Sequence, residues 1–319
     1  MTSIYRKIVF LLFIYTMPLC AEYREEMLPY GDMDQWGIRY IKESKMIGGR
    51  TRTLYTLGGK DTINDNVVYL PTEDNPWSCS NTYAKCIVEA AVGGAVVPEV
   101  RGRGYCCRLS NMVTKIDFCN ISAMVTGSIY LGENLEPLSL SAKTHPYSAI
   151  DFGVPFTQHP VALKFDYKVK IEDLDSITST EKNKPVKIQG RDSAGVILYL
   201  QYRWEDPSTG NIYARRVGTA CEFYDYTIKE WSNNHELPIE WGNVVSDSIS
   251  PYEALNSIPM MTRNSKGKMV RVEEVGYSLD EPTHIFLQIS SSWGAVFQAQ
   301  ENNVLWIDNI RLVYEEDEK

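Results

Sequence analysis

The chain has 319 residues, of which 44% are hydrophobic, 11% aromatic and 23% charged. This composition is that of a globular protein and argues against intrinsic disorder, which needs few aromatic residues and little apolar area. The net charge is −9 and the basic residues form no runs, which argues against nucleic-acid binding, because affinity for a phosphate backbone depends on clustered Lys and Arg.

The first 21 residues have the pattern of a secretory signal. Arg6 and Lys7 precede an apolar run from Ile8 to Leu19, and Ala21 is a small residue before a charged segment. The run is too short to span a bilayer, and no longer apolar stretch follows it. We therefore predict cleavage after Ala21 and a secreted or periplasmic chain. A buried N-terminal helix is the structural alternative.

Lipid attachment at Cys20 is a second alternative for the same segment, and it would display the protein on a membrane surface. A small residue is expected directly before a lipid-bearing cysteine, whereas this chain has Leu19. The sequence therefore favours free secretion over a lipid anchor.

Six of the seven cysteines follow the signal segment: Cys79, Cys86, Cys106, Cys107, Cys119 and Cys221. An even number in an exported chain permits disulfides, but nothing in the spacing selects a pairing. Buried free thiols are an equal alternative in a chain with a large core. There is no Cys-x-x-Cys pair, which argues against a zinc site.

Strand patterns dominate the mature chain. Phe165–Ile171 and the second half of Val304–Tyr314 alternate apolar and polar residues, which predicts half-buried strands. Val196–Arg203 and Thr283–Ile289 are more uniformly apolar, which predicts central strands. Asp206–Gly210 has the Pro and Gly of a hairpin turn.

Helical periodicity is scarce, and the best short candidate is Pro251–Ser257 with Ser250 as its N-cap. Many strands with almost no helices between them predict an all-β, antiparallel β-sandwich with long loops and few short helices. We expect one domain over residues 22–319, with a small N-terminal subdomain as the alternative.

Several segments together resemble the bacterial "putative carbohydrate metabolism domain" (PCMD) family. They are Tyr30–Trp36, Pro76–Asn81, Arg101–Cys106, Gly127–Gly132, Gly153–Thr157, Leu163–Lys168, Arg203–Asp206, Gly210–Ala214, Ser290–Gly294 and Leu305–Ile310. The resemblance implies a jelly roll similar to carbohydrate-binding modules, exported by a bacterium into the periplasm, the medium or the outer-membrane surface. It supplies no catalytic residues. Cys79, Cys86 and Cys107 depart from the family pattern, so it supplies no disulfide framework either.

Sugar binding needs flat aromatic faces for the C–H side of a pyranose and planar polar groups for its hydroxyls. Trp77, Trp204 and Trp293 lie among turn residues, whereas Trp36 and Trp306 lie inside strand patterns and are expected in the core. Burial in the core is the alternative for the first three as well. The predicted carbohydrate-binding residues are Trp77, Asn81, Trp204, Glu205 and Trp293.

A structural calcium ion between the first and last strands is a further expectation. Asp308 in the last strand and Asp32 or Asp34 near the first would supply the oxygen ligands that Ca²⁺ prefers. The alternative is that Asp308 faces solvent on the alternating pattern. No other cofactor is expected.

Hydrolysis of a glycosidic bond needs two carboxylates flanking it. Pairs are available by spacing, but none occurs in a pattern that places two acids on one strand face, so no catalytic residue is predicted. These pairs are Glu205 with Asp206, Glu133 with Glu136, and Glu222 with Asp225.

The sequence therefore favours an exported, non-catalytic protein that binds a glycan through aromatic platforms. The enzymatic alternative is a sandwich-fold glycoside hydrolase or lyase whose carboxylate pair the sequence does not reveal. The third alternative is a structural or adhesive cell-surface protein, which a broad exposed apolar patch would favour.

Overall fold

The computed structural model describes residues 22–85, 88–116, 121–139, 142, 145–172, 175–243 and 251–316. The predicted signal over residues 1–21, which includes Cys20, lies outside these residues, as do Cys86 and Cys119. The helices given in the described part are the short 3-10 turns η1 (Lys45–Ile47) and η3 (Pro146–Ala149). Strands make up the rest of the regular structure, so the predicted all-β class is confirmed. No described helix has the length and apolar character needed to cross a bilayer.

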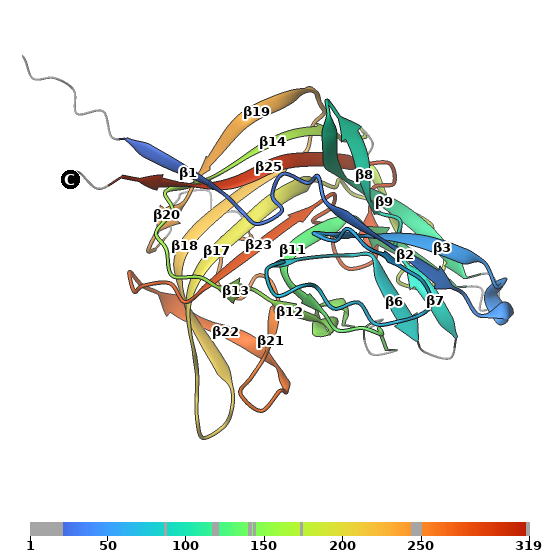
Figure 1. The fold of residues 1–319 in the computed structure, drawn as a ribbon, viewed down its shortest axis with the longest axis horizontal. Helices are drawn as coiled ribbons and strands as arrows, with labels where there is room; N and C mark the ends of the chain where they lie inside the picture. The colour runs from blue at the N-terminus through green and yellow to red at the C-terminus, as the bar shows by residue number, and fades with distance from the viewer. Residues whose placement is uncertain are drawn as a thin grey trace, which may run out of the picture.

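Two large sheets pack face to face as a β-sandwich (Figure 1). The four long strands of the first sheet lie in the order β9 (Gly104–Ile116), β25 (Val304–Glu315), β14 (Ala162–Lys170) and β19 (Ile228–Pro238). It is extended by β1 (Tyr23–Met27), β8 (Val96–Arg101) and β10 (Ile121–Thr126). The long strands of the second sheet lie in the order β11 (Ser128–Asn134), β23 (His284–Ser290), β17 (Ala194–Glu205) and β18 (Ile212–Tyr224). It is extended by β5 (Trp77–Cys79), β12 (Ile150–Phe152), β13 (Val154–Pro155), β20 (Glu240–Trp241), β21 (Met261–Arg263) and β22 (Met269–Tyr277).

The eight long strands follow the order of a jelly roll. Numbered one to eight along the chain, they lie as 1-8-3-6 in the first sheet and 2-7-4-5 in the second. The chain thus changes sheet at every step between long strands except at the β17–β18 hairpin, which gives two interlocked Greek keys. That hairpin turns at the predicted Asp206–Gly210 segment, where Gly210 takes a φ of 75°. The sandwich of jelly-roll type is confirmed.

The main core lies between the two sheets. Phe165, Tyr167 and Val169 of β14 are buried in it, and the residues between them face the outside of the first sheet. This alternation is the one that the sequence pattern predicts for a half-buried strand. By contrast, β17 is buried on both faces, with Leu198 in the main core and Tyr199 in a second apolar cluster. Its nearly continuous apolar sequence follows from this double burial.

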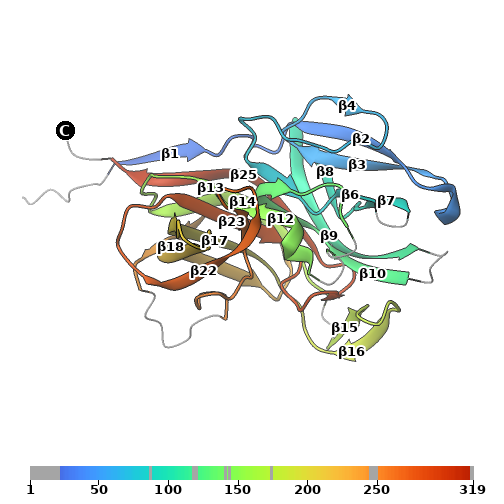
Figure 2. The same cartoon turned by 90° about the horizontal axis from the view of Figure 1, so that it is seen from below.

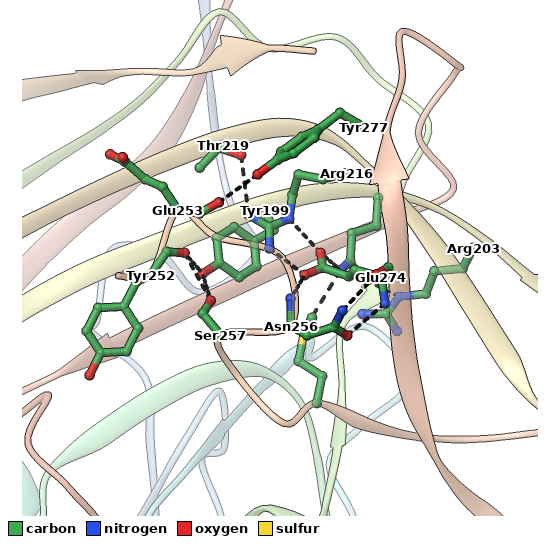
Figure 3. A network of polar contacts seen from close by, with 12 residues as sticks. Tyr199, Arg203, Arg216, Thr219, Tyr252, Glu253, Asn256, Ser257, Glu274 and Tyr277 are labelled. Atoms are coloured by element: carbon green, nitrogen blue, oxygen red, sulfur yellow. Dashed lines mark hydrogen bonds and ion pairs between the residues drawn. The ribbon is translucent and has the colours of Figure 1, made fainter. Parts of the chain in front are cut away.

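The second cluster lies on the far side of the second sheet, where residues 251–260 and the β21–β22 hairpin cover it. A polar network crosses this cover (Figure 3). The Glu274 carboxylate accepts hydrogen bonds from Arg216 Nε (2.6 Å) and Gln201 Nε2 (2.7 Å), and the Arg216 and Glu274 side chains are fully buried. The predicted helix over Pro251–Ser257 is wrong. The segment is a series of turns whose Tyr252 carbonyl accepts hydrogen bonds from side chains instead of from a following helical turn.

Three small sheets surround one end of the sandwich (Figure 2). The first contains β2 (Trp36–Lys42), β3 (Thr51–Leu57) and β4 (Thr62–Ile63), the second β6 (Thr82–Lys85) and β7 (Glu89–Val92), and the third β15 (Ser176–Ser179), β16 (Val186–Gln189) and β24 (Gln298–Ala299). Arg39 of β2 pairs with Glu136 at 2.7 Å, and both side chains are only 1% exposed. This buried ion pair ties the N-terminal sheet to the segment that follows β11. One domain over residues 22–319 stays a prediction.

Candidate functional site

A row of alternating cations and indole rings crosses the outer face of the first sheet. Arg108 on β9 lies opposite Trp306 on β25, and Trp306 lies opposite Lys168 on β14. Lys168 Nζ is 4.3 Å from the centroid of the Trp306 ring and 5.5 Å from that of Trp231 on β19. All four side chains are half-buried. We call Arg108, Trp306, Lys168 and Trp231 the indole–cation row.

Local strand geometry places the row on the outside. The neighbours Cys107, Tyr167 and Ile307 point into the main core, so the residues next to them point outward. The Trp306 ring is then oriented by its Nε1–H, which donates a hydrogen bond of 2.8 Å to Glu99 Oε1. A ring fixed in this way loses little conformational entropy when a ligand packs on it.

A depression of about 420 Å³ adjoins the row. Its size lies within the range of about 300–1,000 Å³ that is usual for small-molecule sites. Its lining combines apolar contact surface, amide and hydroxyl groups and two cations, and it holds no carboxylate: Gly94, Arg108, Ser110, Asn111, Met112, Lys170, Asn302, Val304 and Trp306. Apolar surface with a few convergent polar groups is the composition that suits a sugar ring.

Two carboxylates lie beside the row and share one arginine. Asp166 on β14 is directly opposite Asp308 on β25. Arg101, at the end of β8, donates to Asp308 Oδ2 at 2.6 Å and lies 2.9 Å from Asp166 Oδ2. The same guanidinium lies over Trp231, 3.8 Å from its centroid. The ion-pair cluster therefore joins four strands and positions one ring of the row.

The environment separates the pKa values of these two carboxyls. Burial raises the pKa of Asp308 to about 6, although Arg101 opposes the change. Burial also disfavours the charged form of Asp166, but donors from Asn234, Asn309 and Arg101 outweigh it and hold its pKa below the ordinary value. Divergent pKa values in neighbouring carboxyls are typical of acid–base pairs. Here, however, the Arg101 side chain occupies the space between the two groups.

Two of the five predicted carbohydrate-binding residues, Trp77 and Asn81, lie under the surface near β11. Trp77 is 0% exposed and its Nε1–H donates to the Pro29 carbonyl at 2.7 Å. Asn81 is 1% exposed and its amide donates to the carbonyls of Tyr55 and Val96. An enclosed ring cannot stack on a sugar in this conformation, and the Asn81 amide group is already used by the backbone.

The other three are separated from these two and from the row. Trp293 is 8% exposed and packs against Tyr252 and Phe223 in the second apolar cluster. Trp204 is half-buried on the β17–β18 hairpin, where Glu205 accepts hydrogen bonds from Ser265. The five residues therefore do not converge on one site.

Trp204 is the member of this set that retains an accessible aromatic setting. Its ring lies 5.9 Å, centroid to centroid, from both Tyr202 and Tyr213, and Arg215 lies 5.6 Å above it. The hairpin thus carries a short aromatic stripe of its own.

The expected calcium ligands do not fit that ion. Asp308 Oδ2 accepts a hydrogen bond from Arg101 and Oδ1 accepts one from the Asn309 N–H, so donors occupy both oxygens. Asp34 Oδ1 accepts from the Tyr105 N–H, and Asp32 Oδ1 faces the Asp34 N–H at 3.4 Å. Among the described residues, no three His, Cys, Asp or Glu side chains gather into a metal-binding group. The positive charge beside Asp308 is Arg101.

Sequence reasoning missed the indole–cation row. The expectation that Trp306 is a core residue is wrong, because its ring is half-buried on the outer face, whereas Trp36 does pack against the main core. Alternation within Val304–Tyr314 carried a usable signal, because Leu305 and Ile307 must share one face and Trp306 the other. Trp231 had no such signal, because a β-bulge interrupts the pairing of β14 and β19 nearby.

Comparisons with known proteins identify the family of the chain. A family model described as "Putative carbohydrate metabolism domain" matches residues 60–313. A solved structure described as a putative glycoside hydrolase from Bacteroides thetaiotaomicron is 19% identical, with a TM-score of 0.43 over 70% of this chain and 57% of that chain. A second, described as a putative glycoside hydrolase from Bacteroides vulgatus, is 18% identical, with a TM-score of 0.43 over 91% of this chain and 94% of that one. No curated protein matches the chain. The match over most of the sequence shows that the chain belongs to the putative carbohydrate metabolism domain (PCMD) family.

Proposed function

We propose that this protein binds a glycan on the outer face of its first sheet, with sugar rings stacked on Trp306 and Trp231. The observation that carries the proposal is the indole–cation row beside an open depression. One ammonium lies within 5.5 Å of both ring centroids, so a short oligosaccharide can reach both rings. Membership of a carbohydrate metabolism family supports this choice of ligand.

The arrangement of the Asp166 and Asp308 carboxylates fits glycan binding better than glycan cleavage. In a glycosidase the sugar lies between two carboxyls that are about 5–10 Å apart. Here Arg101 binds both Asp166 and Asp308, and each carboxyl side chain is only 8% exposed. A substrate would have to displace a half-buried guanidinium that is bonded to both carboxylates. The cluster therefore serves to hold the sheet and to position Trp231.

Hydrolysis stays the second candidate because Asp166 and Asp308 lie directly opposite each other in different environments. Asp308, with its pKa raised to about 6, can hold a proton at mildly acidic pH next to an ionised Asp166. Release of reducing ends from a glycan library by the wild type, but not by Asp308→Asn, would favour this candidate over pure binding.

Export is part of the proposal and follows from the pattern of residues 1–21. The cysteines are compatible with an oxidising compartment. Cys79, Cys106, Cys107 and Cys221 are free, and burial raises the pKa of Cys79 to about 12, which keeps that thiol protonated and unreactive. Fractionation of the producing cells tests export directly: the full-length chain retained in the cytoplasm would contradict it.

The binding proposal is tested by affinity electrophoresis on a panel of soluble polysaccharides. We expect retention of the wild type on at least one gel, and loss of it in Trp306→Ala and in Trp231→Ala. Tyr40→Ala removes a ring that is 37% exposed on β2, in a different sheet from the row, and serves as the control. Thermal unfolding of each variant shows that the fold persists. Retention that is lost in Trp204→Ala and kept in both row variants would move the site to the hairpin.

A further inference from the structure

The charge of the proposed site differs from that of the whole chain. The chain has a net charge of −9, yet the depression is lined by Arg108 and Lys170 and by no carboxylate. Lys168 adds a third positive charge between the two indole rings. A positive patch on an acidic protein favours an anionic ligand, because charge complementarity steers association and raises specificity.

Of the three cations Arg108, Lys168 and Lys170, Lys168 is the one without a carboxylate partner among the described residues. Three lysines of β14 face the same way, and two have carboxylates close by: Lys164 lies 2.6 Å from Glu25, and Lys170 lies 2.5 Å from Glu172. For Lys168 no carboxylate lies within ion-pair distance among the residues that the structure describes, and its close contacts are aromatic rings. Two indole faces stabilise the ammonium group and restrict its position, but they do not neutralise it.

The neighbouring cations are only partly compensated. Arg108 lies 3.5 Å from Glu99, whose other carboxylate oxygen is used by Trp306, and both side chains of this ion pair are at least 31% exposed. Three cations therefore lie at or beside the depression. Arg108 is weakly paired, Lys170 is paired, and Lys168 is unpaired. Amide and hydroxyl donors of Asn302 and Ser110 complete its lining.

We infer that the sugar bound on this face is negatively charged. This inference rests on the proposed function and adds the class of ligand to it. The carboxylate of a uronic acid or a sulfate ester lies over the depression, bound by Lys168 and Arg108, while the apolar side of the sugar ring rests on Trp306. Hydrogen bonds between ionised partners are shorter and stronger than neutral ones, so the charge decides which glycan binds.

The experiment compares glycans that differ in charge and share a backbone. Affinities are measured by calorimetry for a galacturonic acid polymer, a sulfated galactan and a neutral galactan. We expect the acidic ligand to bind about tenfold more tightly than the neutral one or better, as one lost charge-assisted hydrogen bond implies. Tight binding of the uronate alone or of the sulfated chain alone identifies which anion the site accepts.

Variants separate this inference from general electrostatic attraction. Lys168→Gln weakens binding of the acidic ligand about tenfold, clearly more than it weakens binding of the neutral galactan, and Lys168→Arg restores most of the loss. Lys42→Gln removes an exposed lysine of β2, which lies in a different sheet from the row, and is the matched control. Raising the ionic strength from about 0.1 M to about 1 M shortens the screening length from about 10 Å to about 3 Å, and weakens only the binding of acidic ligands.

The outcomes distinguish the two proposals. Neutral glycans bound as tightly as acidic ones, with loss in Trp306→Ala and none in Lys168→Gln, would overturn the inference and keep the proposed function. An equal loss in Lys42→Gln would also overturn it, because the attraction would then be unspecific. No binding of any glycan in the panel would overturn the proposed function, and the inference with it.

Discussion

Asp166 and Asp308 face each other directly across β14 and β25, and one guanidinium, that of Arg101, binds both. Arg101 reaches this point from the end of β8, so a single side chain connects four strands of the first sheet. The pair is a structural unit that also supports the Trp231 ring.

Arg101→Met should destabilise the protein by about 2–3 kcal/mol, because it leaves two nearly buried carboxylates without a cation. This value is below the usual cost of breaking a fully buried pair because the Arg101 side chain is 20% exposed. Urea unfolding measures the change. The double variant Arg101→Met, Asp308→Asn should recover part of it, and a loss below about 0.5 kcal/mol in the single variant would contradict this role.

The raised pKa of Asp308 predicts how stability depends on pH. Between the ordinary carboxyl pKa and about 6, the native state holds a proton on Asp308 that the unfolded state has released. Stability from this group is therefore present at low pH and is lost as the pH rises through about 6. Relative to Asp308→Asn, the wild type should lose about 1–2 kcal/mol between about pH 4 and pH 7, with allowance for partial exposure. A constant difference between the two proteins across this range would show an ordinary pKa.

Much of the fold could be predicted because its signals are local. Alternation over Phe165–Ile171 reports which side chains of one strand are buried, and Asp206–Gly210 contains its own turn chemistry. Neither depends on which strands become neighbours. The turns at Pro251–Ser257 could not be predicted in this way, because contacts with distant side chains such as Tyr199 hold them.

The site could not be predicted because it is assembled by strand order. Arg108, Lys168, Trp231 and Trp306 lie on four strands that are remote in sequence and adjacent only in a jelly roll. For Trp77 the error is the reverse: the sequence predicts a surface residue, and the structure buries it. Its turn-rich surroundings indicate a surface loop, yet the carbonyl of Pro29 and the packing around β5 enclose its ring.

The two kinds of tryptophan should differ in stability as well as in binding. Trp77→Ala removes a fully buried ring and should cost about 3–5 kcal/mol through the cavity it leaves. Trp306→Ala should cost about 1 kcal/mol, because its ring is already half in water. Unfolding free energies in urea check both values. A larger loss of unfolding free energy in Trp306→Ala than in Trp77→Ala would show that Trp306 mainly stabilises the fold.

The buried pair of Arg216 and Glu274 should be a sensitive point of the second sheet. Glu274→Ala leaves a fully buried guanidinium unpaired and removes the acceptor of Gln201 and of the Asn256 N–H. We expect a loss of about 3–5 kcal/mol. The double variant Arg216→Met, Glu274→Leu removes both charges and should be more stable than Glu274→Ala. If both variants unfold at the same urea concentration, the uncompensated charge is not the cause of the loss.

The reactivity of the thiols tests the packing on both faces of the first sheet. Cys106 and Cys107 are neighbours in β9 whose side chains point to opposite faces, and both are buried. Burial raises the pKa of Cys106 to about 12 and that of Cys107 well above its ordinary value, so neither forms the thiolate that an alkylating reagent needs. Iodoacetamide labelling followed by peptide mass spectrometry should find both cysteines unmodified in the native protein and modified in urea. Fast native labelling of Cys106 alone would show that the outer face beside Asp308 opens to solvent. A substrate would need such an opening to reach the carboxylates, and the result would therefore favour hydrolysis over binding alone.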